Sequence, residues 1–154
     1  MIRHAERVIG AVLSAVFSRF RVRLFRVEGS SMEPTLTEGE YVIVNNFRYP
    51  WFGALRRGDV VVFECPHAHH HVLIKRVIGL GGEKVEVQKG QVYIDNQPLE
   101  EPYTAAAGTY SWGPFIVPRG EFFVLGDNRN NLCDSHTWGW LPSRNIIGRF
   151  WSLY

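Results

Sequence analysis

Cysteine is scarce in this sequence, and the patterns of a disulfide scaffold or a repeat protein are missing. Only Cys65 and Cys133 occur in 154 residues, and they form no disulfide-dense pattern. We expect both thiols to be unpaired, although an oxidising compartment would permit a bond between them. No internal repeat or low-complexity tract is present. With 45% hydrophobic and 14% aromatic residues, the composition is that of one folded domain with a real core.

A hydrophobic run long enough to cross a bilayer is also lacking. The apolar stretch "VIGAVLSAVF", residues 8–17, would form a helix of ~15 Å, about half of the ~30 Å hydrocarbon core. Extending it would drag three following arginines into lipid, at roughly a few kcal/mol each. Its basic start resembles a signal peptide, but no small-residue cleavage site follows. We interpret residues 1–25 as a short or truncated membrane anchor with a short hydrophobic helix. The alternative is a helix packed on the domain.

Acidic residues are nearly missing from this end of the chain. The net charge of the whole sequence is only +2, but residues 1–26 contain six arginines and one acid, Glu6. A basic and apolar end is attracted to anionic lipid, whereas no nucleic-acid motif accompanies the arginines. Apolar residues near "FRVRLF" (20–25) and in "RYPWFGALRR" (48–57), including Trp51 and Phe52, are of types suited to the lipid interface. We expect membrane lipid, and not nucleic acid, as a partner.

Helical periodicity of useful length is absent after residue 18, and short alternating runs take its place. The pair Lys89-Gly90 between two of them predicts a tight hairpin. The expected strands are 20–28, 41–47, 59–64, 72–79, 84–88, 91–96, 121–126 and 146–153. The stretch 97–120, rich in proline and glycine, is expected to be irregular. The sequence predicts an all-β domain over residues 26–154, with short strands in a Greek-key-like or barrel arrangement.

One of these strands contains a lysine between apolar neighbours. In "VLIKRVIG" (72–79) alternation puts Lys75 on one face with Leu73 and Val77. Burial there would disfavour the ammonium form and lower the lysine pKa, and a neutral lysine near pH 7 can act as a general base. The alternative is an edge strand whose Lys75 points to water. This segment alone leaves both interpretations open.

Two other segments are rich in small polar side chains. "EGSSMEPTL" (28–36) has adjacent serines on a tight turn, and "GDNRNNLCDSHTWG" (126–139) is either an Asx-rich turn or the wall of an active site. With "RGDVVVF" (57–63) and "IKRVIGLGGE" (74–83), these segments stand in the order found in type I signal peptidases. The sequence resembles that family of membrane-bound Ser–Lys serine proteases from about residue 26 to its end.

The resemblance implies roles for individual residues. Ser31, directly before the methionine, would be the nucleophile, and Lys75 the general base. The oxyanion hole would rest on the backbone at Ser31 and Gly29. Supporting residues would be Gly126, Asn131 and Asp134, and the walls of a shallow substrate pocket would be Val27, Met32, Leu36 and Leu73. No cofactor is implied.

The resemblance also implies the substrate and the compartment. Family members bind signal peptides of secreted preproteins in an extended form, by β-addition. They cut after small residues at positions −1 and −3. The catalytic domain would therefore lie on the extracytoplasmic side of a membrane with which the protein is associated.

Some positions depart from the family pattern. A serine that contacts the lysine in many members is here Leu132, and an arginine often found two residues after the last-segment aspartate is here His136. These departures leave open a non-catalytic relative that holds signal peptides without cutting them. Self-cleaving repressors share the Ser–Lys chemistry, but a DNA-binding domain would precede the dyad, and only about 25 residues precede "EGSSM".

Two further sites are conceivable by residue type. "CPHAHHH" (65–71) contains side chains that zinc prefers, but its spacing matches no closed site, and we expect no metal. A triad of Ser31, His136 and Asp134 is the alternative to the dyad, and the family resemblance argues against it.

Overall fold

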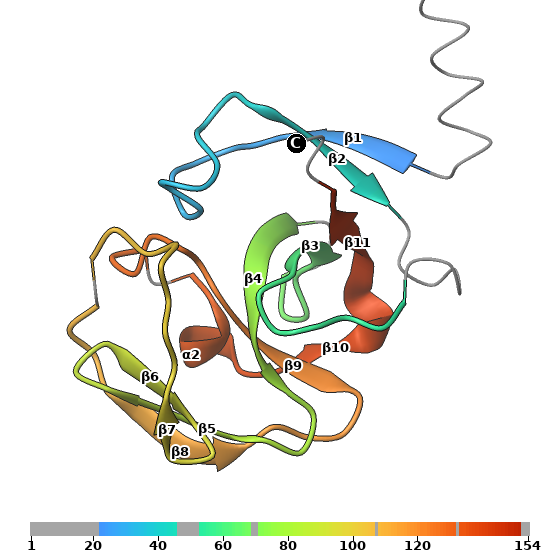
Figure 1. Cartoon of the computed structure of the whole chain (residues 1–154). Helices are drawn as coiled ribbons and strands as arrows, with labels where there is room; N and C mark the ends of the chain where they lie inside the picture. The colour runs from blue at the N-terminus through green and yellow to red at the C-terminus, as the bar shows by residue number, and fades with distance from the viewer. Residues whose placement is uncertain (1–21, 46–52, 69–70, 107, 132, 152–154) are drawn as a thin grey trace, which may run out of the picture.

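The regular structure of the described residues is almost entirely β-strand (Figure 1). The computed structural model describes residues 22–45, 53–68, 71–106, 108–131 and 133–151. The all-β prediction is confirmed within these ranges. The predicted N-terminal helix lies outside them. No helix among the described residues is both long and apolar enough to cross a bilayer.

The strands form two antiparallel sheets (Figure 1). In spatial order, the larger sheet contains β1 (Val22–Arg26), β2 (Tyr41–Asn45), β11 (Ile146–Phe150), β3 (Val60–Glu64), β4 (Val72–Leu80), β9 (Glu121–Leu125) and β10 (Leu141–Pro142). The smaller sheet contains β7 (Gln97–Pro98), β6 (Gln91–Ile94), β5 (Lys84–Gln88) and β8 (Trp112–Ile116). A short helix, α2 (Ser135–Trp138), and a 3-10 turn, η2 (Ser143–Asn145), follow β9.

The predicted strand ranges agree well with this order. Each of the eight expected ranges coincides with one strand, and β4 extends one residue beyond its expected range of 72–79. The predicted hairpin joins β5 to β6, with Gln88 opposite Gln91 and positive φ angles at Lys89 (48°) and Gly90 (85°). A two-residue turn with both φ angles positive matches the twist of the strands that it joins.

The prediction that 97–120 is irregular is partly wrong, because this stretch contains β7 and β8. Strand β8 has mostly exposed side chains and a Gly113-Pro114 pair. It therefore lacks the apolar alternation by which a strand is recognised in a sequence, and its glycine and proline are typical of irregular segments.

Strand β4 changes neighbours half-way along its length, and this positions the site. Its first residues, Val72–Arg76, pair with β3, whereas pairing with β9 begins only at Arg76. No described strand therefore pairs with the second edge of residues 72–75. Lys75 is the last residue before the strand becomes enclosed on both edges.

Candidate active site

Ser31 lies on a tight turn that follows β1. The ladder between β1 and β2 continues to Val27, whose N–H donates to the Glu40 carbonyl at 2.8 Å. Gly29 then takes a φ of +75°, a conformation that favours glycine. The turn is closed by the N–H of Leu36, which donates to the Met32 carbonyl at 2.9 Å. Because Met32 and Leu36 are buried, this turn is fastened to the core.

Lys75 is buried against the turn that carries Ser31. Lys75 is 2% exposed, and its Nζ donates a hydrogen bond to Ser31 Oγ at 2.6 Å. Burial lowers the pKa of Lys75, because it disfavours the charged ammonium, while Asp134, Cys133 and Asp127 act in the opposite direction. The alternative of a Lys75 that points to water is excluded.

The loop after β9 is hydrogen-bonded to the turn that carries Ser31. The backbone N–H of Asn128 donates to the Ser31 carbonyl, and its side-chain Nδ2 donates to the Ser30 carbonyl, both at 3.1 Å. Sequence reasoning missed Asn128. Its position in a polar loop indicates that Asn128 could support the site, but nothing in the sequence distinguishes Asn128 from Asn130 and Asn131.

The three predicted supporting residues have different environments. Gly126 packs so closely that a Cβ added there would lie 2.5 Å from the Ser31 carbonyl oxygen. Asp134 is 1% exposed and accepts from the Gly126 N–H at 3.4 Å. Asn131 bonds within the loop, where its N–H donates to the Asn128 carbonyl at 3.0 Å and its Oδ1 accepts from the Cys133 N–H at 3.3 Å.

His136 is paired with Asp134, as the alternative triad requires, but it is not paired with the serine. Its Nδ1 contacts Asp134 Oδ1, and its Nε2 lies 3.3 Å from the Thr137 hydroxyl. Its ring stacks on Tyr110, with 4.1 Å between the centroids. The hydroxyl of Ser31 is bonded to Lys75 instead. Leu132 lies outside the described residues.

Arg76, next to Lys75, points to the opposite side of β4 and forms an ion pair. Its Nε and one terminal nitrogen donate to the two carboxylate oxygens of Asp127, at 2.8 and 2.5 Å. The same carboxylate accepts from the Thr35 hydroxyl at 2.5 Å. This pair therefore ties the strand of Lys75 to the turn of Ser31.

A pocket of about 430 Å³ opens beside the serine and the lysine. Its walls are residues 25–28, at the end of β1 and just after it, and 71–75, just before and at the start of β4, with Ser31, Val42 and Val62. Two predicted wall residues, Val27 and Leu73, line it. Met32 and Leu36 are not among the lining residues, and they pack in the hydrophobic cluster that contains Val27, Val42 and Val62.

The candidate metal ligands do not gather in the part of the chain that is described. No group of three His, Cys, Asp or Glu side chains there is arranged to hold a metal ion. His69 and His70 lie outside the described residues. Cys65 is buried and Cys133 is exposed, and both are free thiols.

Comparison with known proteins agrees with this geometry. The model of the family described as "Signal peptidase, peptidase S26" matches residues 1–154. The chain belongs to the signal peptidase family. It is therefore a serine peptidase, a hydrolase, and the resemblance inferred from the four sequence segments is confirmed.

Relatives match most of the chain. A signal peptidase I of Leptolyngbya laminosa is 44% identical, over 94% of this chain and 76% of that protein. A thylakoidal processing peptidase of Arabidopsis thaliana is 36% identical over 80% of this chain. A crystal structure of a signal peptidase I from Enterococcus faecalis is 30% identical, with a TM-score of 0.56, and the match covers 62% of this chain and 96% of that one. The β fold is thus that of a signal peptidase, and membership is consistent with membrane association.

Proposed function

We propose that the protein removes N-terminal signal peptides from exported proteins, with Ser31 as the nucleophile and Lys75 as the general base. The observation that carries this proposal is the 2.6 Å hydrogen bond between Lys75 Nζ and Ser31 Oγ, made by a lysine that is 2% exposed. A serine hydroxyl is a weak nucleophile and needs a base within hydrogen-bond reach. Burial supplies that base, because it favours the neutral amine.

The reaction proceeds in two stages. Neutral Lys75 accepts the Ser31 proton as Oγ attacks the scissile carbonyl carbon, and the resulting ammonium returns a proton to the leaving amine as the C–N bond breaks. This step leaves the signal peptide as an ester on Ser31 and releases the mature protein. Water, deprotonated by Lys75, then hydrolyses the ester and restores the serine.

The oxyanion of the tetrahedral intermediate is stabilised by the Ser31 backbone N–H. No described residue accepts a hydrogen bond from this N–H, so it is available to a substrate oxygen. Gly29, two residues earlier, has no side chain, and nothing lies within 4 Å of where a Cβ would be. The substrate carbonyl can therefore approach the backbone closely.

The substrate binds as an added strand between two free edges. Strand β1 is an outer strand of its sheet, and residues 72–75 have one edge without a described partner. Both segments line the pocket. An extended peptide between them places alternate side chains on the same face. Apolar walls that include Val27 and Leu73 limit the depth there, which supports small residues at −1 and −3.

Membrane attachment completes the proposal. Residues 1–25 anchor the domain, with the pocket on the extracytoplasmic side, where exported proteins emerge. The apolar residues Leu24, Tyr41 and Trp151 are 56%, 66% and 53% exposed. They lie in β1, at the start of β2 and directly after β11, and form an apolar face suited to the lipid interface.

A peptide containing an Ala-x-Ala cleavage site tests the proposal. The wild-type protein should cut it after the second alanine, and Ser31→Ala should lower kcat by roughly 10⁴-fold or more, as in other nucleophile–base units. Ser30→Ala is the matched control and should keep most of the activity, because Ser30 contributes its carbonyl to the turn. Binding of the peptide without cleavage by the wild type would instead identify a non-catalytic relative.

A further inference from the structure

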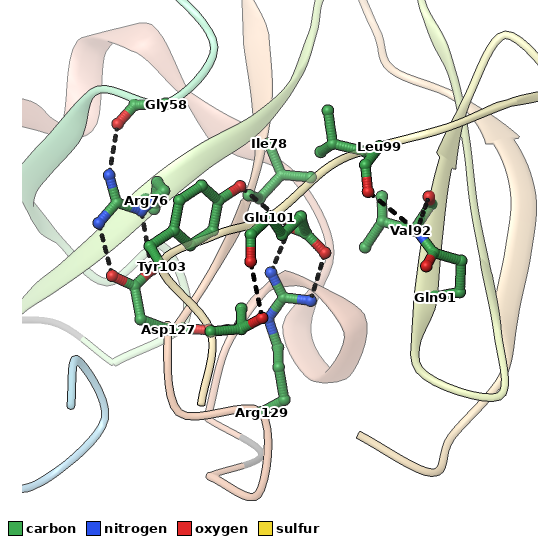
Figure 2. Close-up of polar contacts among 12 residues, drawn as sticks. Gly58, Arg76, Ile78, Gln91, Val92, Leu99, Glu101, Tyr103, Asp127 and Arg129 are labelled. Carbon is green, nitrogen blue, oxygen red and sulfur yellow. Dashed lines mark hydrogen bonds and ion pairs between the residues drawn. The ribbon is translucent and has the colours of Figure 1, made fainter. Parts of the chain in front are cut away.

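We propose that Glu101 is a positioning residue of the active site, and that residues 99–104 act as a brace between the smaller sheet and residues 126–131, the catalytic loop after β9. Glu101 lies outside all the sequence segments that identified the family. This inference rests on the function proposed above. It starts from a buried ion pair that joins parts of the chain far apart in the sequence (Figure 2).

Glu101 and Arg129 are paired away from water. Their side chains are 8% and 2% exposed, and both terminal nitrogens of Arg129 donate to the Glu101 carboxylate, one of them at 2.9 Å. Two buried charges are tolerated only when each satisfies the other. Arg129 belongs to the loop that holds the nucleophile turn, so Glu101 fixes a side chain of that loop.

The first branch of contacts runs from Glu101 to Ser31. Arg129 Nε donates to the Gly126 carbonyl at 3.0 Å. Gly126 packs against the Ser31 carbonyl, and two residues later the Asn128 N–H donates to that carbonyl. The Arg129 guanidinium, held by Glu101, thereby fixes the position of the backbone at residues 126–128, which supports Ser31.

The second branch runs from Glu101 to the strand of Lys75. The Tyr103 hydroxyl donates to Glu101 Oε1 at 3.0 Å, and the guanidinium carbon of Arg76 lies 4.1 Å from the centre of the Tyr103 ring (Figure 2). Arg76 follows Lys75 directly and is paired with Asp127. The carboxylate of Glu101 is therefore connected to both members of the dyad.

The brace has its own anchor in the smaller sheet. The Leu99 N–H donates to the Val92 carbonyl at 2.8 Å, and Gln91 Nε2 donates to the carbonyls of Val92 and Leu99, both at 2.9 Å (Figure 2). Strand β6 thus holds one end of the brace, and Glu101 near its other end is paired with Arg129 of the catalytic loop. The smaller sheet thereby restrains the dyad without contributing a reacting group.

Glu101→Gln tests this role, because it keeps the shape of the side chain and removes its charge. We expect kcat on the Ala-x-Ala peptide to fall by about 10- to 100-fold, the size of effect that small misplacements of reacting groups produce. KM should stay within about twofold, because Glu101 is not among the pocket-lining residues. Glu100→Gln is the matched control, since Glu100 is the exposed neighbour, and it should behave as wild type.

Hydrogen exchange followed by mass spectrometry supplies the second readout. In Glu101→Gln, exchange should accelerate in peptides covering 126–131 and 30–36, and should stay unchanged in the β5–β6 hairpin. If Glu101→Gln does not fold, Glu101→Asp keeps the charge but shortens the reach, and the same changes are expected. Unchanged kcat, or faster exchange throughout both sheets, would overturn the brace. Because exchange does not depend on cleavage, an inactive wild-type protein would refute the proposed function and leave this test standing.

Discussion

At the scale of single residues, the site depends on a difference between two adjacent cations. Lys75 and Arg76 follow each other in β4 and point to opposite sides. An arginine side chain stays charged in proteins, and Arg76 forms an ion pair with the carboxylate of Asp127. Lys75 instead forms a hydrogen bond with the hydroxyl of Ser31. Burial without a directly bonded carboxylate favours the neutral amine, which is the form that can accept a proton.

The pH dependence of activity follows from the lowered pKa of Lys75. Below that pKa the lysine is charged and cannot accept the Ser31 proton, so kcat should rise with pH and then level off. Because burial moves the pKa below the ordinary 10.5, the rising limb should lie below the range of a free lysine. Lys75→Arg keeps a charge that cannot be removed and should lower kcat by roughly 10⁴-fold or more. A pH–rate profile of both proteins, with a peptide free of titratable groups, provides the measurement.

His136→Ala is the control for that experiment. The imidazole contacts Asp134 and Tyr110 and is not bonded to the serine, so its removal should have a mild effect. An inactive His136→Ala protein together with an active Lys75→Arg protein would replace the dyad with the histidine triad.

The sequence proposed the two residues of the dyad more readily than their supports. The residue types alone left Lys75 open, and the resemblance to type I signal peptidases singled out Ser31 and Lys75, which the structure brings within hydrogen-bond distance. Asn128 and Glu101 act through hydrogen bonds whose partners are set by loop conformation. Three asparagines occur within residues 128–131, and only the folded backbone determines which one faces Ser30.

At the scale of elements, strands were predictable where the sequence shows an alternating or a continuous apolar run. Strand β5 alternates between partly exposed and buried side chains at Lys84–Val87, and its period-2 pattern is visible in the sequence. In strand β8, Gly113 and Pro114 interrupt the run, and its apolar residues do not alternate with polar ones, so the sequence contains no period-2 pattern to read. Strands β7 and β10 have two residues each and are too short for any periodicity.

The contact between Gly126 and the turn that carries Ser31 can be tested by a single substitution. In Gly126→Ala, the added methyl would lie 2.5 Å from the Ser31 carbonyl oxygen, so one of the two backbones must move. We expect kcat to fall by about 100-fold, since displacements near 1 Å have effects of this size. Steady-state kinetics of the purified variant provide the measurement.

Gly120→Ala separates this effect from a general loss of stability. Gly120 has a φ of +79°, which strains an alanine, but nothing lies within 4 Å of the added methyl. The control should lower the melting temperature and leave kcat unchanged. If both variants lost activity in proportion to their stability, the contact with Ser31 would not be the cause.

At the scale of the whole molecule, the two sheets have separate tasks. The larger sheet carries Lys75 and presents the free strand edges, and the smaller sheet restrains the catalytic loop through residues 99–104. The larger sheet also has an apolar face. Leu24 pairs with Ile43, and the Trp151 N–H donates to the Ile43 carbonyl, which brings these residues side by side.

This face makes membrane binding the prediction for the whole molecule. Leu24 and Trp151 are more than half exposed, and the exposed Arg23 and Arg26 lie on the same strand as Leu24. Burying a large apolar side chain contributes about 1.5–3 kcal/mol, so the double variant Leu24→Ser, Trp151→Ser should bind vesicles containing anionic lipid at least about tenfold more weakly. Phe115→Ser is the control, because Phe115 is 52% exposed but lies on the smaller sheet. Co-sedimentation of the full chain with vesicles measures both. Equal weakening by the control would show that exposed apolar area in general, and not this face, meets the membrane.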